Sequence, residues 1–240
     1  ETEKNALHHA ELLAIDAASF LGSLLMLWLA GRRFSAPSLP SLEEEEAPAA
    51  LRWRTLTVRQ KRSLLILPAL AAVGSPAMAL LPALAQQLHP QDAAGLALPL
   101  LFARSLGQLC GPMLLKKESL TRFAARTPRI IVCLGIFLAA YGMLPLLSGW
   151  MACALGMIFI AHLASNVLFA AGTFGVLSSF HITQTASASG KAWRWQTLSA
   201  SLFTGIAAVV ASGVGSVQAL YMVSSAALLI VALIMRFYQE

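Results

Sequence analysis

The sequence predicts an all-α protein, a polytopic membrane bundle of about seven transmembrane helices. Of its 240 residues, 58% are hydrophobic and only 12% are charged, and the mean hydropathy is +0.71. The apolar residues gather in runs of about 20, the length that carries a helix across a hydrocarbon core of roughly 30 Å. A soluble core of this size closes with less apolar material, so the excess must face lipid or a neighbouring membrane subunit.

Seven apolar runs are long enough to cross the bilayer. They cover approximately residues 12–30, 63–84, 96–115, 129–147, 150–172, 197–213 and 217–235. The fifth run can extend to Ser178. Small residues recur inside several runs, which is typical of membrane helices that pack closely, and we expect Gly205, Gly213 and Gly215 at such positions.

The basic residues predict the orientation, because Lys and Arg are retained on the cytoplasmic side of a membrane. Fifteen of the 17 Lys and Arg residues lie in one set of connections, whereas residues 85–95, 148–149 and 214–216 carry none. The amino end is therefore expected outside and the carboxyl end in the cytoplasm. Trp193 and Trp195 are expected to anchor the inner interface. Topology explains the net charge of +6, so no nucleic-acid partner is expected.

The chain is expected to have three parts. They are an external amino end with one helix (1–33), a cytoplasmic linker (34–62) and a six-helix bundle (63–240). Glutamates 43–46 lie among prolines in the linker, a composition that cannot bury itself. Residues 51–62 mix apolar and basic side chains, so they either form a short helix on the anionic inner leaflet or merely fix the topology.

Arg104 is the cation that lies inside a span, near its middle. Gln108 and Gly111 follow at spacings of four and three, which gives one helix face a polar and small character unsuited to lipid. A guanidinium at this depth is costly unless it is paired or hydrated. Arg104 and Gln108 therefore either face a cavity, where they bind an anionic group or a proton-carrying carboxylate, or belong to a structural ion pair between helices.

Three further polar residues lie within the predicted spans. Asp16 is the acid inside the first span, where it either forms hydrogen bonds near the outer interface or couples transport to its protonation. His162 and Asn166 are four residues apart and share one helix face. They form either a proton relay or a hydrogen bond between helices.

The second span contains Pro68, Pro76 and Pro82, with Gly74 just before the middle proline. Each proline removes a backbone donor, so the helix is expected to be kinked or partly unwound. Gly74 and Pro76 are therefore candidates for a gate beside a ligand, and a static kink packed against neighbouring helices is the alternative.

Chemistry on a substrate is not expected, and the chain is predicted not to be an enzyme. The sequence has no nucleophile elbow, no phosphate-binding loop and no pair of acids at helical spacing within a span. Cys110, Cys133 and Cys153 are too widely spaced to indicate a disulfide framework or a zinc site. No cofactor and no metal ion are therefore predicted.

The order of one span, a charged linker and six further spans resembles the end of a major facilitator superfamily transporter. Ala14-Ile-Asp-Ala-Ala-Ser-Phe-Leu21 is similar to the start of the sixth helix in the bacterial drug and siderophore exporters of that superfamily. Asn166-Val-Leu-Phe-Ala-Ala-Gly-Thr-Phe-Gly175 is similar to their tenth helix. The Asp-Arg loop signature is absent, and Gly111-Pro-Met-Leu-Leu-Lys-Lys-Glu118 shares only its glycine and positive charges.

This resemblance implies the last helix of the first transporter half followed by the complete second half. It implies proton-coupled export of a small molecule by alternating access, in the bacterial inner membrane. The expected partners are the bilayer, the substrate, protons and an N-terminal half on the same or a separate chain. Two alternatives are a membrane scaffold or assembly factor, whose polar stripe would be sealed by ion pairs without a cavity, and a transport-like region of a larger fusion protein.

Overall fold

The computed structural model describes residues 25, 29, 51–124, 126–147 and 149–238. The chain divides into two compact units, Glu1–Ala49 and Ala50–Glu240, and the helices described below belong to the second. Asp16, the glutamates at 43–46 and the first predicted span, apart from Leu25 and Leu29, lie outside the described residues.

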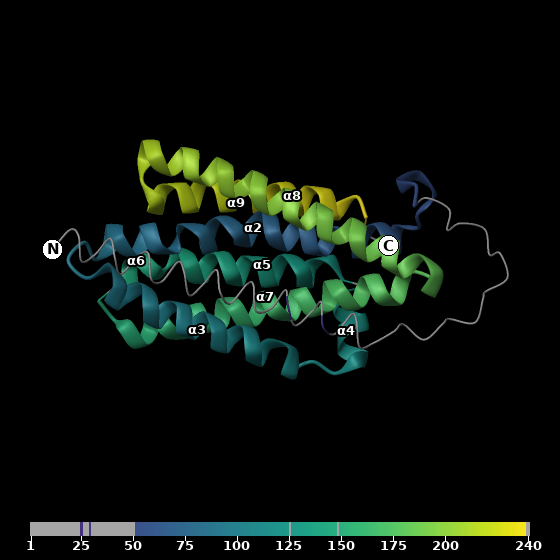
Figure 1. Cartoon of the computed structure of the whole chain (residues 1–240), viewed down its shortest axis with the longest axis horizontal. Helices are drawn as coiled ribbons and strands as arrows, with labels where there is room; N and C mark the ends of the chain where they lie inside the picture. Colours follow the sequence, from purple (N-terminus) through teal and green to yellow (C-terminus); the bar gives the residue numbers. More distant parts are fainter. Residues whose placement is uncertain (1–24, 26–28, 30–50, 125, 148, 239–240) are drawn as a thin grey trace. The chain divides into compact units, whose positions relative to one another are not determined.

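The second unit is built from helices throughout its described part (Figure 1). They are a 3₁₀ turn η1 (Trp53–Thr55) and helices α2 (Val58–Leu88), α3 (Ala93–Met113), α4 (Lys117–Ala124), α5 (Thr127–Gly142), α6 (Leu144–Leu147), α7 (Met151–Ser179), α8 (Ile182–Val214) and α9 (Ser216–Arg236). Five of them, α2, α3, α7, α8 and α9, are long and apolar enough to cross a membrane. The chain is thus an integral membrane protein with a helical bundle, as the sequence predicts.

Two spans differ from their predicted bounds. The span expected at 129–147 is divided into α5 and α6 at Met143. Pro145 explains the division, because its ring conflicts with the carbonyl one turn earlier and it has no N–H to donate. Helix α8 begins at Ile182, well before the expected start at 197. Its first turns are polar, and hydropathy marks where a helix crosses lipid, not where the helix begins.

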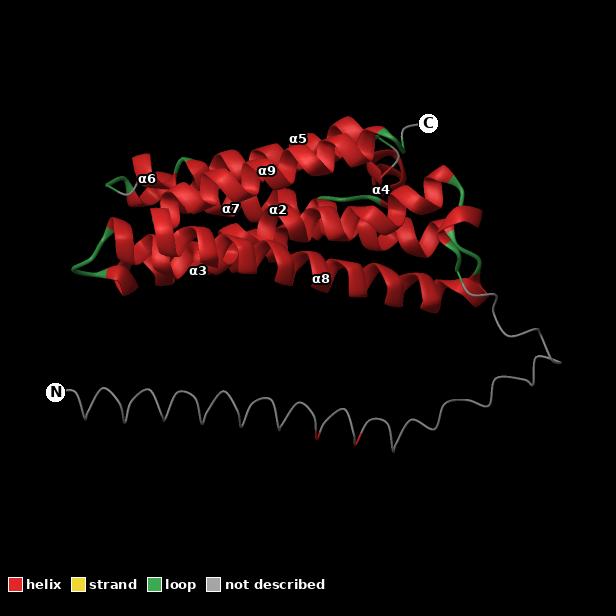
Figure 2. Cartoon of the chain, turned by 90° about the horizontal axis from the view of Figure 1, so that it is seen from above, coloured by secondary structure: helices red, strands yellow, loops and turns green. Residues whose placement is uncertain are grey.

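The long helices form three layers of two (Figure 2). Helices α5 and α9 make one outer layer, α2 and α7 the middle layer, and α3 and α8 the other outer layer. Helix α2 packs most extensively against α8, and α7 packs most extensively against α3, while α2 and α7 also contact each other. Thus α8, which follows α7 in the chain, packs on α2, and α3, which follows α2, packs on α7.

Burial differs greatly between these layers. In the most apolar 18-residue window of each helix, 72% of the α2 residues are buried but only 6% of the α8 residues. Helices α3 and α8 share a layer without packing closely on each other. The surface formed by α3 and α8 is therefore the least buried surface of the described second unit, and we call it the open face.

Glycines allow close packing in the middle layer and at its contact with α3. A Cβ atom added to Gly107 would lie 2.5 Å from the Phe159 carbonyl oxygen, and one added to Gly111 would lie 2.8 Å from Asn166 Cβ. The prediction of close packing is wrong for Gly205 and Gly213, which have no described atom within 4 Å of an added Cβ. Both lie on α8, where few residues are buried.

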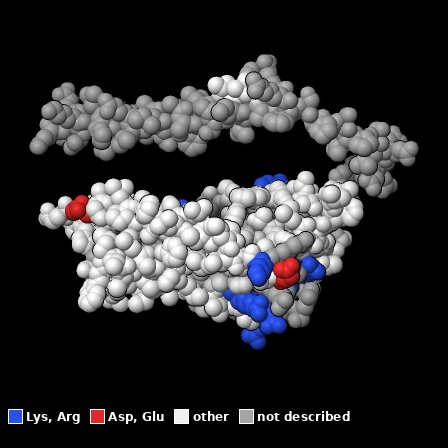
Figure 3. Space-filling model, turned by 90° about the horizontal axis from the view of Figure 1, so that it is seen from below, with Lys and Arg blue, Asp and Glu red and all other residues white. Residues whose placement is uncertain are grey.

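One end of the unit carries most of its charge. Lys and Arg side chains gather toward one end of the face seen in Figure 3, and most of the rest of that face is uncharged. At this end Lys191 Nζ donates to the Leu51 carbonyl oxygen at 2.8 Å, and the rings of Trp53 and Trp195 are 5.2 Å apart. Residues 51–62 form η1 and the capped first turn of α2, and their placement on the membrane surface stays a prediction.

Candidate functional site

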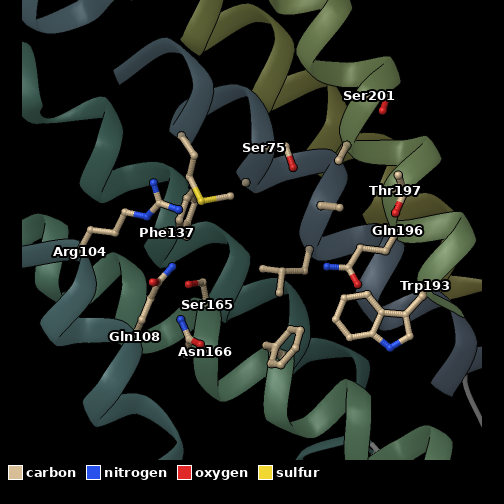
Figure 4. A pocket seen from close by; sticks show the side chains of 16 residues that line it. Ser75, Arg104, Gln108, Phe137, Ser165, Asn166, Trp193, Gln196, Thr197 and Ser201 are labelled. Atoms are coloured by element: carbon tan, nitrogen blue, oxygen red, sulfur yellow. The ribbon is translucent and has the colours of Figure 1, made fainter. Parts of the chain in front are cut away.

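A cavity of about 480 Å³ lies on the open face of the bundle, between α3 and α8 (Figure 4). Helix α2 lies between these two walls, and Phe137 of α5 and part of α7 complete the lining. Its volume is within the range of small-molecule sites. Polar side chains line two walls, one formed by α3 with α7 and the other by α8.

Arg104 and Gln108 belong to the first wall, on successive turns of α3. The close approach at Gly107 and Gly111 brings them beside Ser165 and Asn166 of α7. Both α7 side chains donate to the His162 carbonyl oxygen, Ser165 Oγ at 3.0 Å and Asn166 Nδ2 at 3.1 Å. The amide oxygen of Asn166 therefore remains available to a ligand. Gly111, predicted as part of the same polar stripe, faces α7 and not the cavity.

Arg104 makes no hydrogen bond or ion pair with any described residue. Helices α2, α3, α5, α6, α7, α8 and α9 contain no Asp or Glu. The two described acids are Asp92, which caps α3, and Glu118, which lies in the first turn of α4. The guanidinium thus brings a positive charge to the cavity wall without a described counter-charge.

The second wall consists of α8 residues at helical spacing, namely Trp193, Gln196, Thr197 and Ser201. Trp193 contacts the edge of Phe169, with ring centroids 5.9 Å apart. The side-chain oxygen of Gln196 is buried and has no hydrogen-bond partner among the described residues. The sequence does not predict this wall, because Trp193 and Gln196 precede the span expected at 197–213, and Trp193 is expected at the membrane interface. The three- and four-residue spacing was the available signal.

His162 belongs to a different polar site, behind the cavity wall. Its side chain is fully buried, and its Nε2 lies 2.7 Å from the hydroxyl of Tyr141 on α5. The ring also packs edge-on against Phe137. The predicted pair is therefore separated, since Asn166 lines the cavity and His162 does not. The structure contains the hydrogen bond between helices, and a proton relay through His162 stays a prediction.

Gly74 and Pro76 lie in the middle of α2, which remains helical from Val58 to Leu88. Helix α2 is therefore not unwound at these residues. Gly74 and Ser75 line the cavity, and Pro76 is buried next to them. A gating role for this segment stays a prediction.

Within the described ranges, no group of three His, Cys, Asp or Glu side chains is arranged to hold a metal ion. No family model, no curated protein and no solved structure matches the chain. The geometry of the cavity and of the helix layers is therefore the basis for a functional assignment.

Proposed function

We propose that the chain is part of a secondary active transporter of the major facilitator type, which moves a small molecule by alternating access. It would contribute the last helix of the first half and the six-helix second half. The observation that carries this proposal is the cavity between α3 and α8, which is lined by polar side chains and contains an Arg104 without a described partner. A charge of this kind in a membrane bundle is tolerated where water or a ligand reaches it.

The order of the helices supports the same proposal. The spans α2, α3 and α5–α6 form one set of three, and α7, α8 and α9 form another. Because three is an odd number, the two sets cross the membrane in opposite directions. Their reciprocal packing, with α8 on α2 and α3 on α7, fits the inverted repeats on which many transporters are built.

Proton coupling and export, in a bacterial inner membrane with the carboxyl end inside, are the finer parts of the proposal. They depend on the resemblance of the sequence. Since no carboxylate lies within the described membrane segments, a carboxylate that couples protons would be Asp16 or a residue of the other half. The described bundle would then supply substrate contacts, and its partners would be the bilayer, the substrate, protons and that other half.

A membrane scaffold with the same helices would have a polar stripe closed by ion pairs and no cavity. The described bundle has the cavity and has no described ion pair at Arg104, so this observation favours transport over a scaffold. No feature of the described residues favours a fusion protein.

Alternating access can be tested without knowing the substrate, by thiol labelling of Ser75→Cys in the complete protein. Ser75 lines the cavity near the middle of α2. The native Cys110, Cys133 and Cys153 are first replaced by Ala. We expect an impermeant maleimide to modify Cys at position 75 in right-side-out and in inside-out vesicles. The two alternating conformations of the protein open the cavity to opposite sides of the membrane.

The matched control is Ser224→Cys. Ser224 lies in α9 and is fully buried, so this thiol should not react from either side. Labelling of position 75 from one side alone, or from neither, would contradict alternating access and favour the scaffold.

A further inference from the structure

The charge of the cavity restricts the ligand that it can hold. A guanidinium keeps its positive charge at all accessible pH values and presents a planar fork of donors. No described Asp or Glu lines the cavity with Arg104. A cationic ligand would be repelled and a neutral one would leave the charge uncompensated, whereas a carboxylate can accept two parallel hydrogen bonds from the fork. The α3 wall therefore favours an anion.

The α8 wall carries one aromatic ring beside its polar side chains. Trp193 is 48% exposed, although it lines the cavity, and its position is supported by the edge contact with Phe169. Aromatic rings stack against or meet the edge of another ring with a gain beyond simple burial. The ligand therefore combines a negative group near α3 with a ring near α8.

Gln196 adds a polar requirement on the α8 side. Its side chain points into the cavity, and its buried oxygen has no hydrogen-bond partner among the described residues (Figure 4). A buried polar atom without a partner is costly. A hydroxyl both donates and accepts, so it satisfies the Gln196 amide whichever way that amide is turned.

We propose that the cavity binds a small organic anion that has an aromatic ring, with a carboxylate directed to Arg104 and a hydroxyl directed to Gln196. This inference rests on the proposed transport function and names the substrate class of the same cavity. It predicts that 4-hydroxybenzoate, which carries the two groups at opposite ends of one ring, is a better ligand than analogues that lack either group.

The test is protection of Ser75→Cys from maleimide by 4-hydroxybenzoate, measured in the complete protein. We expect the apparent Kd to rise at least about tenfold in Arg104→Gln, because a charge-assisted hydrogen bond is lost. We expect a rise of about fivefold in Trp193→Leu, and a similar rise when benzoate replaces 4-hydroxybenzoate. The neutral 4-hydroxybenzamide and the cationic 4-hydroxybenzylamine should give little protection. The control Arg59→Gln removes an exposed charge in the first turn of α2 and should leave protection unchanged.

Labelling without ligand shows whether each variant keeps the cavity open to reagent. Equal protection by the amide and the acid, or protection by the acid that Arg104→Gln does not weaken, would overturn the assignment of an anion. Labelling from both sides with no protection by 4-hydroxybenzoate would overturn the substrate class and leave transport standing. Protection combined with labelling from one side alone would overturn transport and leave the binding site standing.

Discussion

Two polar sites lie close to the α3–α7 contact, and they differ in how their polar groups are satisfied. At His162 and Tyr141 both side chains are fully buried and hydrogen-bonded to each other. At Arg104 and Gln108 both side chains are partly exposed, and no described residue is hydrogen-bonded to either. A polar group in a membrane bundle needs a partner. In the first site the protein supplies a partner for His162 Nε2, although the buried Nδ1 has none among the described residues, and in the second no described residue supplies one.

The layers of the bundle explain this difference. His162 is hydrogen-bonded to Tyr141 of α5, and both side chains are buried. Arg104 lines the cavity between α3 and α8 and makes no hydrogen bond with a described residue. The polar residues of the two sites therefore lie close together but differ in availability. His162 and Tyr141 are used in packing between helices, whereas Arg104 and Gln108 are available for binding.

The largest expected effect comes from a change at the contact that both sites share. In Gly107→Ala the new methyl group would meet the Phe159 carbonyl oxygen, which belongs to the backbone and cannot move aside. We expect the free energy of unfolding to fall by about 3 kcal/mol, because α3 must shift away from α7. The measurement is chemical denaturation of the purified complete protein.

The matched control is Gly156→Ala on α7, where an added Cβ has no described atom within 4 Å. That change should alter the free energy of unfolding by less than about 1 kcal/mol, and it can stabilise the helix. A Gly107→Ala protein as stable as the wild type would show that α3 and α7 are not in close contact.

A smaller effect is expected when the buried His162–Tyr141 pair loses one of its two partners. Tyr141→Phe keeps the ring but leaves His162 Nε2 buried without its hydrogen bond. We expect a loss of about 1–2 kcal/mol in the free energy of unfolding, while labelling and protection of Ser75→Cys stay as in the parent protein. The same measurement on Tyr141→Phe/His162→Leu should show less than the summed cost of the two single changes, because no unpaired nitrogen remains.

Suppose that Tyr141→Phe abolished protection of Ser75→Cys by 4-hydroxybenzoate but left the free energy of unfolding unchanged. That result would contradict the roles assigned to the two sites. In that case the His162–Tyr141 pair would belong to the binding machinery.

Hydropathy predicted most of the fold because lipid imposes one strong requirement on every span. It located α2, α3, α7 and α9, but it could not find the polar first turns of α8, which need not cross lipid. A single charge in an apolar run predicts Arg104 as a candidate and helical spacing adds Gln108, and both residues line the cavity.

The rest of the site could not be predicted in the same way. Gln196 carries no charge and lay in a segment that was assigned as a connection. The partner of His162 depends on how α5 packs against α7, and spacing along one helix does not contain that information.

The melting temperature of Arg104→Ala, compared with that of the wild-type complete protein, tests the central claim most directly. If Arg104 faces an open cavity and has no buried partner, the change strands no charge, and the melting temperature should stay within about 2 °C of the wild type. If Arg104 is instead locked in a buried ion pair, removal of the guanidinium leaves an uncompensated charge worth about 3–5 kcal/mol. A drop of about 6 °C or more would therefore contradict the open site and favour a structural role for Arg104.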